Sequence, residues 1–448
     1  MHAMTSLAFL YVILPVAMAV FLLCPPVWRR GALLAVSLCF FLLVQPSTFP
    51  LLLVCLATDW LILAFMRRYH DSRRFCRGCV AVSVVKNLLV FLVLEILFQM
   101  NRLVEAPWGL RVYLLSSLSC ILEAYRGEVP EDYHPVSYLL YCCFFPRLEA
   151  GPLLPYRDFV PQLESLNPSP TEIGRGFGLV LQGAVKTGVL AQALQATYDA
   201  LRAFPAEDLT VAGLWSAVLV LALSVYYRLS GLSEMAQGIG QMMGISLPKN
   251  FYYPYQSQGV TDFFQRFLIT VSNFICRNVY QPLHAGSPNV LADCLNLILW
   301  GVLMGLWFGL QVNYLLWGAF LSLFLILEKH VFPNAMKKVP TLFLRLYTLG
   351  VVLCSFAIFG GTSPRSSAMT LTNMFRLRQL DLSNDRLVYL LTSNWLLLAV
   401  SLLFATSAVS LLLNFLRKIL PRFATVLLTA AIDGVLLAVF TVFTIRVG

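Results

Sequence analysis

The chain has 448 residues, of which 59% are hydrophobic and 12% are charged. Soluble domains carry about twice that charged fraction, so the composition excludes an ordinary soluble protein. The formal net charge of +10 would allow a nucleic-acid-binding protein, but the basic residues gather in short loops beside apolar segments, which is the pattern of membrane proteins.

Apolar windows of about 20 residues, long enough to cross a hydrocarbon core of about 30 Å, recur along the chain. We therefore predict an all-α polytopic membrane protein of about 11 or 12 spans. It would form a single integral-membrane domain over residues 1–448. The expected spans include residues 7–24, 31–44, 48–66, 79–100, 110–122, 173–201, 214–227, 342–359, 390–413 and 424–443.

The loops between the first spans alternate between basic and nearly uncharged. The basic loops contain Arg29 and Arg30, the five arginines of residues 67–77, Lys337 and Lys338, and the basic residues of 417–422. Loops rich in Lys and Arg stay in the cytoplasm. We therefore predict a protein integral to the cytoplasmic membrane, with its N-terminus outside. The opening apolar run has no basic stretch before it, so it is expected to remain as a first membrane helix.

Two ionisable side chains, Asp59 and Lys86, lie inside predicted spans. Such residues are expected to face the interior of the bundle, where a structural ion pair or snorkelling is favoured over catalysis. Further along, Pro146, Gly151 and Pro152 lie within ten residues of one another. They cannot all belong to one straight helix, so we predict a broken or re-entrant segment there.

The stretch 226–318 places charged and amide side chains between segments that otherwise resemble membrane spans. They are Arg228, Glu234, Lys249, Asn250, Asp262, Arg266, Arg277 and Asn313. Polar groups at membrane depth are costly unless they line a cavity or meet partners. We therefore predict that this stretch holds the functional chamber.

A dispersed but specific order of residues runs through the same stretch. It comprises Ser230, Gly231, Glu234, Met235, Pro248, Asn250, Phe251, Pro254, Tyr255, Asp262, Phe263, Arg266, Ser272, Tyr280, Pro282, Leu283, Gly305, Leu306, Trp307, Gly309, Asn313, Leu316, Trp317 and Gly318. This order resembles the membrane-bound O-acyltransferase superfamily, in particular the bacterial branch of the alginate O-acetylation membrane protein and the D-alanine export protein of teichoic acid synthesis. The resemblance implies a helical bundle with re-entrant segments around a central funnel, and residues 226–318 would form its core motif region.

Two positions depart from the family pattern. The family has one histidine in a segment similar to RRWHIS and another in a segment similar to GLWHGA, and the matching positions here are Leu268 and Phe308. Neither side chain can titrate or donate a hydrogen bond. Both expected imidazoles are therefore missing. The resemblance also assigns a lining of the funnel, comprising Arg228, Asn250, Arg266, Tyr280, Trp307 and Asn313.

Acyl transfer to a hydroxyl needs a group that takes the hydroxyl proton. Three residues are candidates for a relocated base. Burial could raise the pKa of the carboxylates of Glu234 and Asp262 into the range of a general base. A structural pairing with Arg228 or Arg266 is the simpler interpretation. His284 is the histidine nearest the motif, and its alternative is a solvated loop histidine. His2, His70, His134 and His330 lie at terminal, loop, turn or helix-end positions.

The resemblance implies O-acylation of an exported polysaccharide or cell-envelope polymer. Under the first hypothesis the chain is catalytically degenerate and serves as a scaffold, a partner or an acyl or lipid passage. Under the second it is an active acyltransferase with a relocated base, which would use acyl-CoA or an acyl-carrier thioester as donor. The third, an unrelated transporter, is disfavoured by the density of the motif residues and by the lack of an internal repeat in the sequence.

The implied partners are membrane lipids, an extracytoplasmic acyltransferase and polymer-synthesis proteins, and no nucleic acid is expected. The sequence predicts no metal site. Cys76 and Cys79 form a lone CxxC pair without a second ligand pair near it.

Overall fold

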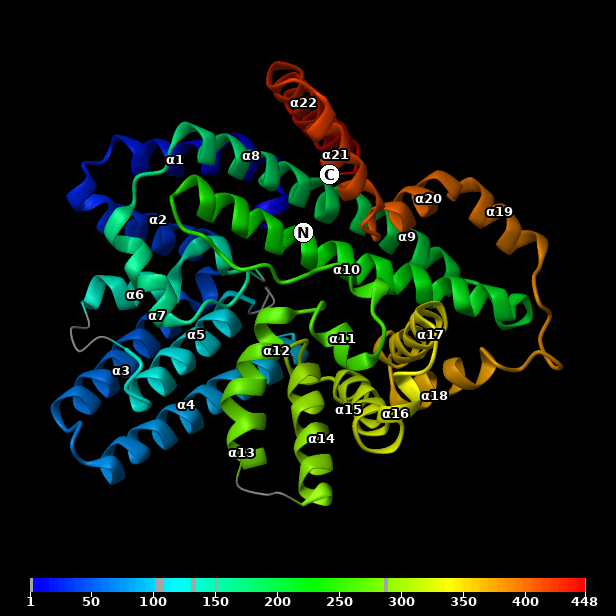
Figure 1. Cartoon of the computed structure of the whole chain (residues 1–448), viewed down its shortest axis with the longest axis horizontal. Coiled ribbons are helices and arrows are strands. Elements are labelled where there is room, and N and C mark those ends of the chain that lie inside the picture. Colours follow the sequence, from blue (N-terminus) through cyan, green and yellow to red (C-terminus); the bar gives the residue numbers. More distant parts are fainter. Residues whose placement is uncertain (1–2, 102–107, 130–133, 150, 286–288, 448) are drawn as a thin grey trace. The chain divides into compact units, whose positions relative to one another are not determined.

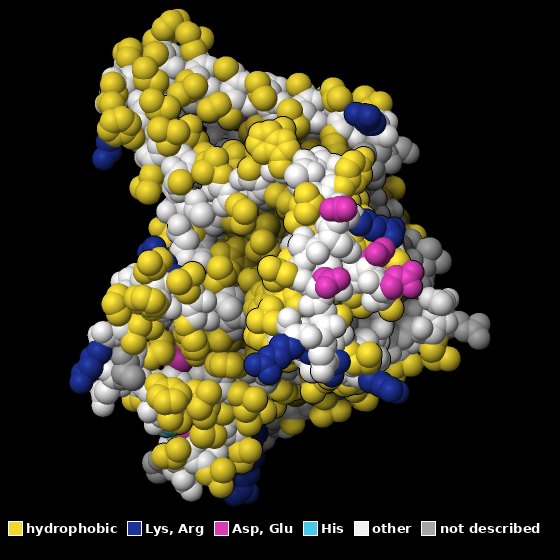
Figure 2. All heavy atoms as spheres, turned by 90° about the vertical axis from the view of Figure 1, so that its right-hand side faces the viewer, with side chains coloured by type: hydrophobic (Ala, Val, Ile, Leu, Met, Phe, Trp, Pro, Cys, Tyr) yellow, Lys and Arg dark blue, Asp and Glu magenta, His cyan; other side chains and the backbone are white. Residues whose placement is uncertain are grey.

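The computed structural model describes residues 3–101, 108–129, 134–149, 151–285 and 289–447 (Figure 1). In these ranges the regular elements are helices, and the one isolated β-bridge pairs Phe251 with Phe267. The predicted all-α class is confirmed. Hydrophobic side chains are spread over much of the face in Figure 2, and most of the Asp and Glu side chains visible there gather on its right-hand part, whereas Lys and Arg are scattered.

The chain folds into two compact units. Of the described residues, unit 1 takes those within 1–184 and 232–249, and unit 2 those within 185–231 and 250–447. The helices of unit 1 are α1 (Leu14–Leu23), α2 (Arg29–Val44), α3 (Phe49–Arg68), α4 (Arg73–Gln99), α5 (Trp108–Tyr125), α6 (Pro135–Cys143), α7 (Tyr156–Phe159) and nearly all of α8 (Pro170–Val185).

Unit 2 contains most of the stretch 226–318, which was predicted to hold the functional chamber. Its helices are α9 (Ala191–Arg202), α11 (Val260–Phe264), α12 (Ile269–Ile275), α13 (Gln281–Ala285), α14 (Val290–Leu306), α15 (Val312–Ile326), α16 (Pro333–Met336), α17 (Thr341–Phe359), α18 (Pro364–Asn373), α19 (Asp385–Ser393), α20 (Trp395–Phe404), α21 (Ala408–Ile419) and α22 (Arg422–Val447). The helix α10 (Val211–Met242) contributes its first part to unit 2 and its last part to unit 1.

Eight helices of the described residues are long and apolar enough to cross a membrane, or nine if one bent pair is a single span. They are Pro26–Val44, Pro46–Arg68, Arg73–Gln99, Pro170–Arg202, Val211–Met242, Val312–Val331, Thr341–Phe359 and Phe423–Arg446. Two shorter apolar helices, Phe9–Leu23 and Val290–Leu306, accompany them. The protein is therefore polytopic. The sequence predicted about 11 or 12 spans because it also counted shorter and bent segments by their apolar content.

One expected span is interrupted. Residues 390–413 were predicted to cross in one piece, but α19 and α20 meet at an angle of 62°. The break lies at Asn394, whose side chain donates a hydrogen bond to the carbonyl oxygen of Leu390 at 3.0 Å. Side-chain bonds of this kind compete with the regular helical pattern. A second break follows at Ala405, where α20 ends.

The ionisable residues inside the first spans form the expected structural pair. Asp59 is fully buried, and its Oδ2 lies 2.5 Å from Nζ of Lys86. Tyr113 and Ser117 donate hydrogen bonds to the same oxygen at 2.5 and 2.6 Å. A buried carboxylate is tolerated when a cation and hydrogen-bond donors satisfy it. This network joins α3, α4 and α5 within unit 1.

The segment with closely spaced prolines is broken, as predicted. The helix α6 ends at Cys143 and a single 3₁₀ turn, Phe145–Arg147, follows it. Arg147 is 1% exposed, and its guanidinium lies over the rings of Tyr141 and Phe159 at 4.8 and 5.3 Å from their centroids. Arginine stacks on aromatic rings in this manner when it is removed from water. Aromatic packing therefore holds the broken segment within unit 1.

Candidate functional site

Close packing of α14 against α15 shapes the second motif segment. A Cβ atom on Gly318 would collide with the carbonyl oxygen of Gly301, and one on Gly305 would collide with that of Tyr314. Small residues let helix backbones approach in a membrane, where the hydrophobic effect adds little to helix association. The turn that carries Phe308 follows α14 directly, so this packing fixes its position.

The first motif segment is held by one buried amide. Oδ1 of Asn250, which is 2% exposed, accepts hydrogen bonds from the backbone N and from Oγ1 of Thr270 at 3.0 and 2.9 Å. The carbonyl oxygen of Asn250 accepts a third bond, from the N of Ile269 at 3.0 Å. Beside it, the rings of Phe251 and Phe267 lie 5.2 Å apart in an edge-to-face arrangement. Asn250, assigned to the funnel lining from the sequence, therefore anchors the start of α12.

Leu268 lies at this anchored turn, at the N-cap of α12. Its φ of 52° is left-handed, and its side chain is 1% exposed. Residues other than glycine rarely adopt this backbone conformation, and histidine, asparagine and aspartate adopt it more readily than leucine does. The backbone at residue 268 therefore has a geometry that suits histidine better than the residue present.

Phe308 lies in an aromatic cluster. Its ring centroid is 5.0 Å from that of Phe359, 5.5 Å from that of Trp317 and 6.0 Å from that of Tyr314. Such pairs contribute stability through their edge-to-face geometry as well as through burial. The second family-histidine position is therefore occupied by apolar packing.

Three buried polar atoms belong to residues of the same motif segment. In the described part of the chain, Nε1 of Trp307, Nε1 of Trp317 and Oδ1 of Asn313 have no hydrogen-bond partner. Nδ2 of Asn313 does have one, because it donates to the carbonyl oxygen of Gly361. An unsatisfied buried polar group costs about 1–3 kcal/mol, so each of these atoms calls for an explanation.

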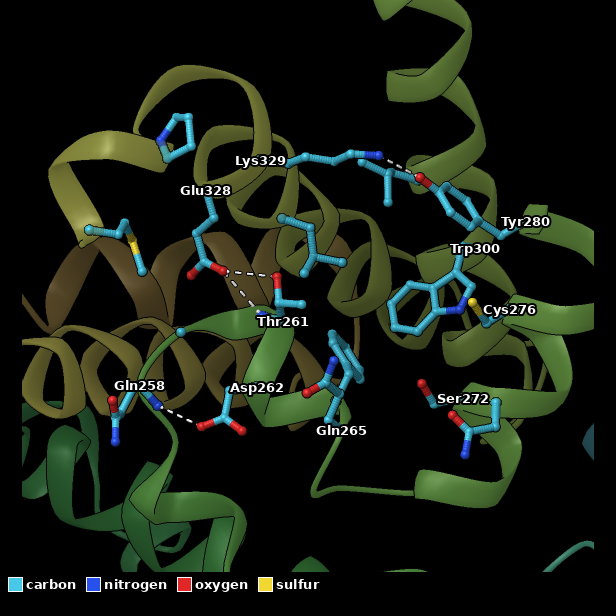
Figure 3. Close-up of a pocket in the computed structure, with 17 residues that line it drawn as sticks. Gln258, Thr261, Asp262, Gln265, Ser272, Cys276, Tyr280, Trp300, Glu328 and Lys329 are labelled. Carbon is cyan, nitrogen blue, oxygen red and sulfur yellow. Dashed lines mark hydrogen bonds between the residues drawn. The ribbon is translucent and has the colours of Figure 1, made fainter. Parts of the chain in front are cut away.

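A cavity of about 650 Å³ lies within unit 2 (Figure 3). Its volume is within the range of small-molecule sites. Its lining residues are Gln258, Gly259, Thr261, Asp262, Phe264, Gln265, Ser272, Asn273, Cys276, Tyr280, Leu297, Trp300, Leu325, Glu328, Lys329, Pro333 and Met336. Asp262 and Tyr280, two of the residues that the sequence analysis named, are among them. Leu268 and Phe308 are not among the described residues that form its wall.

Glu328 fixes one wall of this cavity. It is 9% exposed, and its carboxylate accepts hydrogen bonds from the backbone N of Val260 at 2.6 Å and from the N and Oγ1 of Thr261 at 3.1 Å each. Figure 3 shows the carboxylate directed at Thr261. These bonds satisfy the first amides of α11, which have no partner inside the helix. Glu328 is engaged in structure and is not poised as a base.

Asp262 forms the ion pair that we expected. Its Oδ1 lies 2.7 Å from Nε of Arg266, and its Oδ2 accepts from the N of Gln258 at 3.0 Å. The guanidinium of Arg266 lies 5.7 Å from the ring centroid of Tyr252. Both side chains of the pair are more than a quarter exposed, so the pair contributes at most about 1 kcal/mol to stability. It orients Asp262 at the cavity wall.

A denser cluster gathers around Asp293, in the first turn of α14. Tyr280 donates to Oδ1 at 2.7 Å, and Nδ1 of His284 lies 2.8 Å from the same oxygen. Nζ of Lys329 and Nε2 of His330 each lie 2.7 Å from Oδ2. Asp293 is 3% exposed, whereas the side chain of His284 is 48% exposed. We call these five residues the Asp293 cluster.

The cluster has the geometry of a general base held by a carboxylate. An ionised carboxylate only accepts hydrogen bonds, so Nδ1 of His284 is the donor, and proton transfer to a ligand would fall to Nε2. The ring of His284 stacks on Tyr280 with centroids 5.4 Å apart, which fixes its plane. Tyr280 and Lys329 reach the cavity wall, and Figure 3 shows the ammonium of Lys329 directed at the hydroxyl of Tyr280.

The phenol of Tyr280 and the thiol of Cys276, both on the cavity wall, are kept protonated. Burial raises the pKa of the Tyr280 phenol, and the hydrogen bond from Lys329 opposes that rise without cancelling it. Burial also raises the pKa of the Cys276 thiol. The thiolate is the nucleophilic form, so Cys276 is not activated for covalent catalysis.

The two predicted residues on α10 are part of different units. Arg228, in unit 2, donates from Nη2 to Oε1 of Gln195 at 3.4 Å, and its carbonyl oxygen accepts from Oγ1 of Thr187 at 3.1 Å. Glu234 is half-buried in the part of α10 that belongs to unit 1. Neither residue is among the described residues that line the 650 Å³ cavity.

Sequence reasoning missed Asp293, Glu328, Lys329 and His330. One signal was available, because Asp293 interrupts the apolar run 290–306, and a carboxylate in such a run points to a partnered site. The partners of Asp293 could not be predicted from a local pattern of this kind. Tyr280 and His330 are 13 and 37 positions from Asp293, so only the fold brings them together.

A family model of membrane-bound O-acyltransferases (MBOAT) matches residues 36–370. The chain belongs to the MBOAT family. The match covers about three quarters of the chain and includes Leu268, Phe308 and the Asp293 cluster. The resemblance found in the sequence is therefore confirmed.

Several curated proteins are similar to this MBOAT chain. It is 29% identical over 334 residues to "Probable alginate O-acetylase AlgI" of Pseudomonas fluorescens, covering 74% of this chain and 67% of that protein. It is 31% identical over 253 residues to the protein of the same name from Pseudomonas aeruginosa, covering 56% and 48%. The peptidoglycan O-acetyltransferase of Helicobacter pylori is 28% identical over 256 residues, covering 56% and 48%. The chain thus spans about half the length of most of these relatives.

Proposed function

We propose that this MBOAT protein takes part in the O-acylation of an exported polysaccharide or cell-envelope polymer and that it is catalytically degenerate. It would act as a scaffold, an assembly partner or a passage for acyl groups or lipids. The family and the names of its similar proteins, which are an alginate O-acetylase and a peptidoglycan O-acetyltransferase, support the pathway. Similarity to a family does not by itself establish the activity of this chain, so the support for catalytic degeneracy comes from the site.

The observation that carries the proposal is the pair of apolar side chains at the family-histidine positions. Leu268 is 1% exposed, and the ring of Phe308 packs against Phe359, Trp317 and Tyr314. Neither side chain can accept a proton from a hydroxyl or donate a hydrogen bond to an oxyanion. The segment of Phe308 keeps Gly305, Leu306, Trp307 and Gly309 of the family motif, and the segment of Leu268 keeps Arg266 and Ile269. The fold is therefore kept while two titratable groups are replaced by apolar volume.

Two features support an origin of these positions in histidine. The backbone at Leu268 has the left-handed φ of 52° that histidine adopts more readily than leucine. In the same motif segment as Phe308, the indole N–H groups of Trp307 and Trp317 and Oδ1 of Asn313 are buried without partners in the described residues, and the ring of Trp317 packs on Phe308. An imidazole both donates and accepts hydrogen bonds, so at residue 308 it could satisfy a neighbouring polar atom that phenylalanine cannot.

A relocated base is the second candidate function, and the Asp293 cluster favours it. Asp293 orients His284 through Nδ1 at 2.8 Å, and Tyr280 and Lys329 continue to the cavity wall. In that reaction Nε2 of His284 would take the proton of an acceptor hydroxyl. The hydroxyl oxygen would form a bond to the thioester carbonyl carbon, and the departing thiolate would take the proton. His284 is a better candidate than Asp262, whose carboxylate is paired with Arg266 at 2.7 Å.

The remaining expectations are part of the same proposal. The protein would lie in the cytoplasmic membrane with its N-terminus outside, among membrane lipids and polymer-synthesis partners. An active form would take an acyl-CoA or acyl-carrier thioester from the cytoplasm. An extracytoplasmic acyltransferase would complete the transfer to the polymer.

The test is a complementation experiment. A deletion strain receives wild type, Leu268→His/Phe308→His, Glu234→Gln, Asp262→Asn or His284→Ala, and the O-acyl content of its envelope polymers is measured beside the amount of inserted protein. His70→Ala is the matched control, because His70 also lies beside an aspartate but is 75% exposed. Degeneracy predicts that acylation requires the protein and survives each single change. Loss of acylation in His284→Ala alone supports the relocated base. Acylation that never depends on the protein refutes both.

A further inference from the structure

The last helix of the chain, α22, is nearly uncovered. Only 6% of its apolar window is buried within the protein, against 50% for the spans Pro170–Arg202 and Val211–Met242. Phe440 is its anchor, since this side chain is fully buried and would meet a Cβ placed on Gly188. The rest of the helix is left for lipid or for another protein to cover.

A carboxylate interrupts this uncovered helix near its middle. Asp433 is 11 residues from the start of α22, which is about 16 Å along the axis of a helix about 39 Å long. In the described ranges, no hydrogen bond or ion pair within 4 Å reaches Asp433, and Arg417 of α21 acts on it only through its field. The side chain is partly exposed. Ionisable groups at this depth are rare and face a partner or a water-filled space.

A row of small residues runs beside Asp433. Ala430, Gly434 and Ala438 follow one another at four-residue intervals on one face of α22, and all three are exposed. A Cβ on Gly434 would meet no atom within 4 Å, so the protein itself does not use the space that this glycine leaves. Small residues at this spacing let a second transmembrane helix approach closely.

We propose that α22 docks one transmembrane helix of another protein, and that this helix carries a lysine, arginine or other strong donor at the depth of Asp433. The small residues would form the contact, and the donor would satisfy the carboxylate that the chain leaves unpaired. The negative charge of Asp433 favours a helix of another protein over a second copy of this chain. A second copy in a two-fold arrangement would bring two Asp433 carboxylates together in a medium of low dielectric constant, which like charges disfavour.

The test uses full-length protein in lipid nanodiscs and two synthetic 24-residue Leu/Ala helices. Both peptides carry a Gly-xxx-Gly row, and one has lysine at its midpoint where the other has leucine. Binding is followed by energy transfer between a label on the peptide and a label on a C-terminal tag. The lysine peptide should bind wild type more tightly than the leucine peptide does. Asp433→Asn should weaken the lysine peptide by about 3-fold to 18-fold, the range of measured interhelical polar contacts.

Two further variants keep the result decisive. Gly434→Leu should abolish binding of both peptides, and because the site is open this change should not disturb folding. Val439→Leu, at an exposed position away from the row of small residues, should leave binding unchanged. Equal binding of the two peptides, or no effect of Asp433→Asn, overturns the proposal. Wild-type dimers that Gly434→Leu dissociates would also overturn it, because the occupant would then be a second copy.

Discussion

The substitution Asp293→Asn tests whether the Asp293 cluster is an organised site. The amide keeps the shape of the side chain but removes the charge that four donors share, at 2.7 Å from Tyr280, Lys329 and His330 and 2.8 Å from His284. Removing one partner of a buried pair costs about 3–5 kcal/mol. Lys329 and His284 are 40% and 48% exposed, which lowers the expected loss to about 2–4 kcal/mol.

The assay is thermal unfolding of the purified protein in detergent, followed with a thiol-reactive dye that reports buried cysteines. At roughly 2 °C per kcal/mol for a chain of this size, the expected fall in Tm is about 4–8 °C. Asp208→Asn is the matched control, because Asp208 pairs with Arg386 at 2.8 Å while both side chains are about one third or more exposed. The control should lose less than about 2 °C. Equal losses in the two variants would refute the interpretation of the cluster as a buried, organised site.

Three further substitutions follow from the contacts, each measured by the same unfolding assay. Gly318→Ala should lower the free energy of unfolding by at least about 2 kcal/mol, and therefore lower Tm, because the new Cβ meets the backbone of the facing helix. Gly350→Ala is its control and should not lower Tm, because its Cβ would meet nothing within 4 Å. Asn250→Ala should cost about 1–3 kcal/mol, since it leaves a buried backbone N–H of α12 unpaired, and an unchanged Tm would contradict this anchoring role. Asp59→Asn should cost about 3–5 kcal/mol, because the carboxylate is fully buried on a lysine ammonium at 2.5 Å, and a loss below about 1 kcal/mol would contradict the pairing.

The sequence predicted the parts of the fold that depend on local pattern. Apolar windows located most of the spans, the closely spaced prolines located the broken segment after α6, and two ionisable residues inside spans, Asp59 and Lys86, predicted a structural pair. The bend at Asn394 was missed because residues 390–413 are apolar enough on average for one span, although the polar residues Thr392, Ser393 and Asn394 interrupt the apolar sequence.

The site was harder to predict because it depends on contacts between distant residues. The left-handed turn at Leu268 follows from hydrogen bonds to Asn250, which lies 20 positions before Thr270. The partners of Asp293 come from two other segments of the chain, residues 280–284 and residues 329–330. Position and spacing could therefore nominate His284 and Asp262, but they could not show that His284 meets a buried carboxylate while Asp262 is paired with Arg266.

The most direct test of catalytic degeneracy is the polymer O-acyl content of the deletion strain complemented with one combined variant, Glu234→Gln/Asp262→Asn/His284→Ala. This variant removes every candidate base at once and is compared with wild type at equal amounts of inserted protein. If the chain is catalytically degenerate, the two strains carry the same O-acyl content and the strain without the protein carries less. Loss of acylation in the combined variant, with insertion intact, would contradict degeneracy and assign the chemistry to this chain.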